Sequence, residues 1–227
     1  DIQRVYKKND NLERKCMFKT IKEEHVEAEI VEKKSKFIAN IFYVNTTEMA
    51  EDIIKKTNKK YFDARHNCYA YSIKNINENV KRFSDDGEPS GTAGAPILNI
   101  IEKNEINNIL VIVTRYFGGI LLGTGGLVRA YSEATMRALE RVTYANEECG
   151  MEMLITISYS DFENFKYFCR KKNISIINTT YNKYIECTIE VNNEEKQNII
   201  DNNEKNNFNI LNNKVIKEKN IRKNIEI

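Results

Sequence analysis

Three carboxylates lie within four residues in the segment Arg82–Pro96, which reads RFSDDGEPSGTAGAP. Asp85, Asp86 and Glu88 could together hold a magnesium ion through bound water, because Mg²⁺ takes oxygen ligands and keeps several waters. The other interpretation is an Asx-type turn before a helix that starts near residue 92, with Ser90 or Thr92 as the helix cap. Magnesium sites commonly need substrate phosphates to complete them, which favours the turn over the ion site of Asp85 and Asp86.

A glycine-rich segment, Thr114–Arg129, runs from the end of a predicted buried strand to the start of a predicted helix. Its glycines are Gly118, Gly119, Gly123, Gly125 and Gly126. Glycines at a helix N-terminus expose backbone N–H groups beside the positive end of the helix dipole, so this segment predicts a phosphate site. Arg115 and Arg129 flank the loop, and Tyr116 and Phe117 offer rings for stacking on a base. The alternative is a sharp strand-to-helix connection in which Arg115 pairs with one of the two aspartates.

The named nucleotide-binding motifs fail when their spacing is checked. Gly118 and Gly123 have the spacing of the phosphate loop of ATPases, but Thr124 stands where that motif requires lysine. The dinucleotide fingerprint fails as well, because Val128 occupies the position of its third glycine. Neither ATPase nor dinucleotide-dependent chemistry is supported.

His66 and Cys68 are two positions apart on a predicted strand, so they share one face of it. An imidazole there could activate a cysteine thiolate. A buried free cysteine is ordinarily a small apolar residue, and that interpretation is favoured for Cys68. We include His66 among the candidate ligand-binding or nucleic-acid-binding residues. His25 is the only other histidine, which excludes a centre built from several histidines.

The charge of the whole chain is nearly balanced, with 35 basic and 33 acidic residues among 227. Any affinity for nucleic acid must therefore come from local arrangement. All nine glycines lie between Gly87 and Gly150, and arginine dominates over lysine among the cations from Arg82 to Arg141. Arginine has a planar fork that matches phosphate and stacks on bases, so both patterns point to one functional region.

Five cysteines without a CxxC pair argue against a disulfide framework or a zinc site and indicate a reducing compartment. No apolar run approaches the roughly 18 residues of a membrane span, and the first residues do not contain the apolar core of a signal peptide. We expect a soluble cytoplasmic protein that does not bind membranes.

Hydrophobic patterning predicts two domains, residues 17–141 and 150–227, preceded by an extension or artificial remnant at residues 1–16. The first domain is expected to combine a sheet with helices. Its predicted strands are residues 25–30, 36–44, 67–73 and 109–114, and its predicted helices are residues 48–60 and 127–141. A short linker is expected around residues 142–150.

The second domain shows the order strand, helix, strand, strand, helix, strand. The predicted elements are residues 151–159, 161–172, 174–180, 184–191, 193–203 and 209–216. This order is the βαββαβ pattern of ferredoxin-like domains.

Three segments resemble the signature of the YigZ/IMPACT family: ARHNCYAYSI, RFSDDGEPSGTAGAPIL and VTRYFGGILLGTGGLVRAYSEA. The resemblance covers residues 17–141, and residues 150–227 resemble the C-terminal domain of bacterial members. It implies an α+β protein whose first domain is an α/β sandwich like the second domain of a small-subunit ribosomal protein. The second domain would be like the ferredoxin-like domain V of elongation factor G.

The resemblance also implies a role in translation. Animal and fungal members of the family regulate translation through a protein partner, but they carry an additional N-terminal interaction domain, so that partner is not carried over. No catalytic residues are established for the family, and fold likeness to ribosome-binding domains is analogy.

The leading hypothesis is therefore an RNA- or ribosome-associated regulator of translation that needs no cofactor and has no DNA specificity. Arg115, Arg129 and the glycine-rich segment would bind RNA phosphates. The alternative is a magnesium-dependent enzyme acting on a phosphorylated small molecule. Both hypotheses require the acidic and glycine-rich segments to lie side by side, with Arg115 or Arg129 close to a carboxylate.

Overall fold

The computed structural model describes residues 17–201 and 207–224, so the predicted extension at residues 1–16 lies outside the described residues. The described chain divides into two compact units. Among the described residues, residues 18–146 and 222–224 belong to the N-terminal unit, and residues 147–201 and 207–221 belong to the C-terminal unit. Each unit combines a sheet with helices, so the α+β class predicted from the sequence is confirmed.

The N-terminal unit is built on a five-stranded antiparallel sheet with the order β2-β3-β6-β4-β5. These strands are β2 (His25–Glu32), β3 (Ser35–Tyr43), β4 (His66–Lys74), β5 (Asn79–Ser84) and β6 (Ile109–Tyr116). The apolar run of β6 makes it the central strand, buried at every position except Tyr116. Lys36 of β3 pairs with Tyr116, and His66 of β4 pairs with Arg115. The starts of β3 and β4 therefore meet the end of β6 at one end of the sheet.

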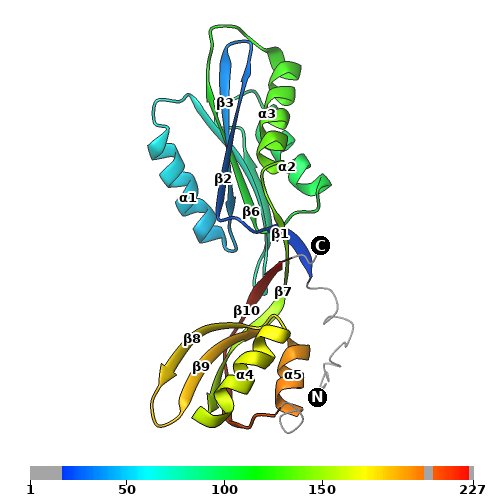
Figure 1. The fold of residues 1–227 in the computed structure, drawn as a ribbon. Coiled ribbons are helices and arrows are strands. Elements are labelled where there is room, and N and C mark those ends of the chain that lie inside the picture. Colours follow the sequence, from blue (N-terminus) through cyan, green and yellow to red (C-terminus); the bar gives the residue numbers. More distant parts are fainter. Residues whose placement is uncertain (1–16, 202–206, 225–227) are drawn as a thin grey trace, which may run out of the picture. The chain divides into compact units, whose positions relative to one another are not determined.

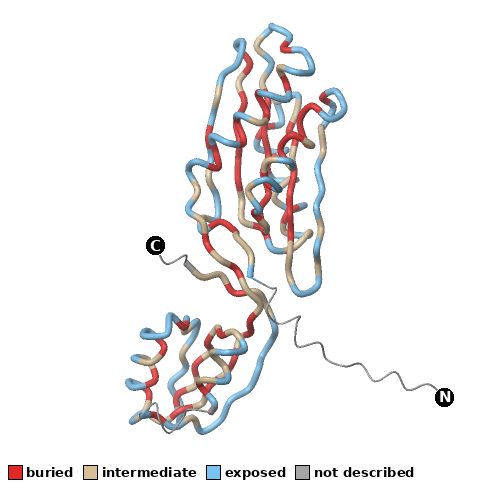
Figure 2. Tube along the Cα trace, turned by 90° about the vertical axis from the view of Figure 1, so that its right-hand side faces the viewer, coloured by how far each residue is buried: buried red, intermediate tan, exposed pale blue. Residues whose placement is uncertain are grey.

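Helices cover both faces of this sheet (Figure 1). Helix α1 (Thr47–Lys60) lies on one face, and α2 (Gly94–Lys103) and α3 (Gly123–Leu139) lie on the other. Side chains alternate along β6, so Val111 and Val113 enter the core beneath α2 and α3, while Leu110 and Ile112 enter the smaller core beneath α1. In Figure 2, the buried residues of this unit, drawn in red, lie largely along the strands of the sheet.

The C-terminal unit has the predicted βαββαβ order. Its elements are β7 (Tyr144–Ile157), α4 (Tyr159–Lys171), β8 (Ser175–Tyr181), β9 (Ile185–Val191), α5 (Asn193–Asp201) and β10 (Ile210–Asn224). Strand β7 pairs with β9 and with β10, and β9 pairs with β8, which gives the strand order of a ferredoxin-like sheet. Alternate residues of β7 and β9 are buried with Phe165 of α4 and Ile199 of α5, so one face of the sheet carries the core.

Strand β7 is continuous through the residues where the sequence suggested a linker. The boundary between the units falls between Asn146 and Glu147, inside this strand. Gly150, which we interpreted as the end of a linker, serves close packing: a Cβ there would lie 2.8 Å from both Ile221 Cδ1 and the Val191 carbonyl oxygen. The unit boundary falls within the predicted range of residues 142–150, but residues 144–150 form part of a strand and not the short linker that we expected.

The chain crosses the unit boundary a second time between Ile221 and Arg222, inside β10. The Arg222 guanidinium donates a hydrogen bond to the Ile21 carbonyl, pairs with Glu24 and lies 4.0 Å from the centre of the Tyr43 ring. Ile21 ends the short strand β1 (Phe18–Ile21), which pairs with β7. These contacts hold Arg222 within the N-terminal unit, to which it belongs.

Candidate functional site

A buried ion pair joins the acidic loop, defined as residues Asp85–Glu88, to the end of β6. Arg115 Nη1 lies 2.6 Å from Glu88 Oε1, and only 7% of the arginine side chain and 3% of the glutamate side chain are exposed. Tyr131 of α3 donates its hydroxyl to the same carboxylate oxygen at 2.9 Å. The prediction that Arg115 or Arg129 approaches a carboxylate of this loop is confirmed for Arg115 and Glu88.

Burial changes the role expected of Arg115. Its guanidinium lies 5.6 Å from the centre of the Phe37 ring and 5.6 Å from that of the Phe117 ring. Its Nε is buried and has no hydrogen-bond partner among the described residues. The expected phosphate contact is not available to this side chain, because its position on the central strand directs it into the core toward Glu88.

Asp85 caps helix α2 from a distance. Its carboxylate accepts hydrogen bonds from the backbone N–H groups of Gly91 at 2.8 Å, Ala93 at 3.0 Å and Gly94 at 2.8 Å. We expected a hydroxyl cap, but the nearest candidate, the Thr92 hydroxyl, donates instead to the Pro89 carbonyl. An acceptor eight or nine residues upstream of the helix was outside the pattern that the sequence suggested.

Asp86 joins the acidic loop to the edge of β4. Its Oδ2 accepts a hydrogen bond from the Asn67 backbone N–H at 2.6 Å. Asp86 and Gly87 both have positive φ, +41° and +82°, and Glu88 N–H donates to the Asp85 carbonyl, so these residues form a tight turn.

The three carboxylates of the acidic loop face different protein donors, as the turn interpretation requires. Among the described residues there is no group of three or more His, Cys, Asp or Glu side chains placed to hold a metal ion.

His66 and Cys68 form separate contacts with the acidic loop. The His66 ring is half-buried, and its Nδ1 donates to the Asp86 carbonyl at 2.7 Å. Cys68 Sγ donates to the Asp85 carbonyl at 2.9 Å and to the Tyr131 hydroxyl at 3.3 Å. Burial raises the pKa of the Cys68 thiol to about 12, so it stays protonated at neutral pH. An imidazole-activated thiolate is therefore wrong, and Cys68 is a core residue.

The glycine loop, defined as residues Gly118–Gly126, begins with glycines that the fold requires. A Cβ on Gly118 would lie 2.0 Å from the Lys34 carbonyl carbon, so this residue must be glycine where the loop passes the β2–β3 turn. Gly119 and Gly123 have φ values of +85° and +72°, which side chains rarely adopt. Gly126 packs closely on Leu122, with 3.0 Å between an added Cβ and the Leu122 Cβ.

Gly125 is different from the other glycines of the loop. It lies in the first turn of α3 with an ordinary helical φ, and an added Cβ would meet no atom within 4 Å. Leu122, which precedes the helix, supplies no side-chain cap, and the first turn contains no acidic residue. The first backbone N–H groups of a helix have no partner inside it, so this helix start exposes donors beside an open surface.

The surface around the glycine loop combines exposed arginine side chains with exposed apolar side chains. Arg129 is exposed and forms no hydrogen bond or ion pair within residues 17–201 and 207–224. Leu121 is 83% exposed and Ile120 is 43% exposed. Phe117 is also exposed, with the Arg65 guanidinium 6.0 Å from the centre of its ring.

Tyr116, the expected stacking residue, is half-buried, and its hydroxyl donates a hydrogen bond to Asp63 at 2.8 Å. The sequence reasoning missed Arg65, Ile120 and Leu121. An apolar triplet enclosed by glycines, Gly119-Ile-Leu-Leu-Gly123, was the signal that could have identified the last two.

Comparison with known proteins shows that the acidic loop and the glycine loop lie within a single family domain. Residues 33–139 match the Impact N-terminal domain, and residues 155–202 match a domain of unknown function, DUF1949. The IMPACT family member YvyE of Bacillus subtilis is 36% identical over 171 residues, which cover 75% of this chain and 77% of that protein. The IMPACT family member YigZ of Escherichia coli is 34% identical over 154 residues, covering 67% and 76%.

A crystal structure described as a hypothetical protein shares the fold. It is 27% identical, covers 86% of this chain and 97% of its own, and superimposes with a TM-score of 0.58. No helix in the described part of the chain combines the length and apolarity needed to cross a membrane.

Proposed function

The chain belongs to the IMPACT family, and from this premise we propose that it is a regulator of translation that binds RNA on the ribosome through the start of α3. The phosphate-binding surface consists of the glycine loop and Arg129. Arg115, which the sequence suggested as a second phosphate ligand, supports the site from inside by holding the acidic loop.

Gly125 carries this proposal. A glycine inside a helix costs about 1 kcal/mol relative to alanine, because it loses more conformational freedom on folding. Neither the packing nor the φ of Gly125 requires glycine. Because Gly125 has no side chain, a phosphate can closely approach the free backbone N–H groups at the start of α3. The glycine is therefore better explained by ligand binding than by folding.

Arg129 is placed to contact the same phosphate. Residues four apart lie on one face of a helix, so Arg129 lies on the same face of α3 as Gly125, about one turn further along the helix. Helical side chains lean toward the N-terminus, which brings the guanidinium toward the glycine loop. An arginine without an internal partner is free to form bidentate contacts with a phosphate.

The role in translation is what the resemblance to the IMPACT family implies. Phosphate contacts carry no base information, so we expect RNA binding with little sequence preference and no DNA specificity. The magnesium-dependent alternative has no such support, because Asp85, Asp86 and Glu88 all accept hydrogen bonds from protein donors.

Binding of a fluorescein-labelled single-stranded RNA, followed by anisotropy, tests the proposal together with co-sedimentation of purified ribosomes. Arg129→Ala should weaken RNA binding by about tenfold and reduce the salt slope by about 1. Arg129→Lys should recover part of the loss, because lysine does not form the bidentate fork. Gly125→Ala should weaken binding without lowering the stability of the protein.

Arg137→Ala is the matched control. Arg137 lies on the same helix but is paired with Glu133 and Glu140, so its removal should leave RNA affinity within about twofold. Equal affinities of Arg129→Ala and Arg137→Ala, or an unmodified protein that binds neither RNA nor ribosomes, would reject the proposed site.

A further inference from the structure

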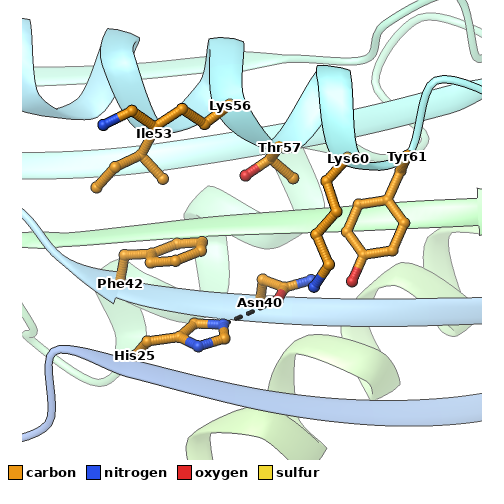
Figure 3. Close-up of a pocket in the computed structure, with 8 residues that line it drawn as sticks. All are labelled: His25, Asn40, Phe42, Ile53, Lys56, Thr57, Lys60 and Tyr61. Atoms are coloured by element: carbon orange, nitrogen blue, oxygen red, sulfur yellow. Dashed lines mark hydrogen bonds between the residues drawn. The ribbon is translucent and has the colours of Figure 1, made fainter.

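A cavity of about 240 Å³ lies beneath α1, on the face of the sheet opposite to α2 and α3 (Figure 3). It is formed by residues of β2, β3 and α1 and by the residue that follows α1. The lining residues are His25, Asn40, Phe42, Ile53, Lys56, Thr57, Lys60 and Tyr61. Pockets for drug-sized ligands typically span about 300–1,000 Å³, so this one suits a smaller molecule.

Asn40 places an unused hydrogen-bond donor in this cavity. The residue is only 1% exposed, and its Nδ2 has no hydrogen-bond partner among the described residues. Its Oδ1 lies 2.9 Å from His25 Nε2, so the oxygen is engaged and the amide hydrogens are not. Buried side-chain donors nearly always have a partner, so the unpartnered Nδ2 of this lining residue is a donor that a bound acceptor could use.

Lys60 brings a positive charge to the same cavity. Its side chain extends from α1 toward β3, the strand that carries Asn40 (Figure 3). A hydrogen bond with Tyr61 raises the pKa of Lys60, so the ammonium is charged at neutral pH. Its ion pair with Glu27 is long, at 3.5 Å, and both side chains are about half exposed.

The other charged groups at the cavity are Lys56, on the wall, and its partner Asp52. Their ion pair spans 3.8 Å, and both side chains are largely exposed. Exposed pairs of this kind contribute little energy, so an incoming anion can compete for either lysine.

Flat and apolar surfaces complete the cavity. The His25 and Phe42 rings are stacked, with centroids 4.4 Å apart and planes inclined by 15°. Ile53 faces Phe42 from α1 (Figure 3). These side chains provide an apolar wall beside the donors, which is the arrangement that fixes a small ligand in one orientation.

We propose that this cavity binds a small organic carboxylate. The apolar body of the ligand lies against Phe42 and Ile53, and its carboxylate accepts hydrogen bonds from Asn40 Nδ2 and Lys60 Nζ. A carboxylate taken out of water needs both a counter-charge and hydrogen-bond donors, and this cavity supplies both. The site uses residues distinct from the glycine loop and lies on the other face of the sheet.

Titration of the full ¹⁵N-labelled chain with benzoate, cyclohexanecarboxylate and 3-phenylpropionate at millimolar concentration tests this inference. Amide chemical shifts of α1 and of the β2–β3 hairpin should move with at least one of these probes. The neutral analogue benzamide should bind several-fold more weakly than benzoate. Lys60→Met should weaken carboxylate binding by about fivefold or more, and Asn40→Leu should weaken it by at least as much.

Lys55→Met is the matched control, because Lys55 is an exposed lysine of the same helix that does not line the cavity. The affinity of the Lys55→Met variant for the carboxylate should stay within about twofold of that of the unmodified protein. If Asn40→Leu does not fold, Lys60→Met decides the question, because it changes an exposed side chain. The inference is overturned if none of the three carboxylates shifts these amide signals. It is also overturned if the unmodified protein binds benzamide as tightly as benzoate, or if the Lys60→Met variant binds the carboxylate as tightly as the unmodified protein does.

Discussion

Replacing Arg115 with methionine tests whether the buried ion pair holds the acidic loop on the sheet. The guanidinium lies 2.6 Å from Glu88 Oε1, and both side chains are less than a tenth exposed. Removing the cation leaves the Glu88 carboxylate buried, with the Tyr131 hydroxyl as its remaining side-chain donor. Breaking a buried pair in this way typically costs about 3–5 kcal/mol, a large share of the 5–15 kcal/mol that stabilises a domain.

Urea unfolding measures this loss. The chain contains 12 tyrosines and no tryptophan, so tyrosine fluorescence and far-UV circular dichroism are the suitable signals. With a slope of about 2 kcal/mol per molar urea, Arg115→Met should lower the midpoint of the N-terminal unit by roughly 2 M. Arg137→Met is the control, because its ion pairs are exposed and worth about 1 kcal/mol or less.

A double variant separates the ion pair from the loss of packing. Glu88→Gln keeps an oxygen that can accept the Tyr131 hydroxyl but removes the buried charge. The combination of Arg115→Met with Glu88→Gln should therefore be more stable than Arg115→Met alone. The reasoning would be refuted if Arg115→Met lowered the free energy of unfolding by less than about 1 kcal/mol, or if the effects of the two substitutions were strictly additive. Arg115 would then again be a candidate for contacting phosphate.

Two further outcomes follow from the contacts of the acidic loop. Asp85→Ala should destabilise the protein by about 2 kcal/mol, because three backbone N–H groups at the start of α2 lose their acceptor, and Asp85→Asn should recover part of this in thermal unfolding. At pH 8 the raised pKa of Cys68, about 12, leaves roughly one thiol in ten thousand ionised, so iodoacetamide should label it only after unfolding. Its labelling in the native protein at the rate of an exposed thiol would contradict the burial.

The sequence predicted most of the fold where one hydrophobic pattern dominated. The apolar run of β6 and the alternation of β9 were recognisable because each records a single environment, a buried strand or a strand with one buried face. Strand β5 was missed because it is an edge strand with no buried residue, so its pattern resembles that of a loop. Helix α3 starts four residues earlier than predicted, since its first turn contains glycines that carry no periodic signal.

The candidate site was predicted less completely. A contact between the acidic loop and an arginine of the glycine-rich segment was predicted from their charge and glycine content, but the ion pair of Arg115 is with Glu88 and with neither of the two aspartates. Arginine is usually exposed, and its burial here depends on Tyr131, which lies 16 positions further along the chain. The cavity beneath α1 was not predicted at all, because its donors come from separate elements whose packing no local pattern records.

The two crossings of the unit boundary, one in β7 and one in β10, make the C-terminal unit an insertion into the chain of the N-terminal unit. Tension applied between Phe18 and Arg222 would pass through the N-terminal unit, because both attachment points belong to it. The inserted unit would be shielded from the load until Arg222 separates from Ile21, Glu24 and Tyr43. Under such a load, the contacts of Arg222 must break before the ferredoxin-like unit is extended.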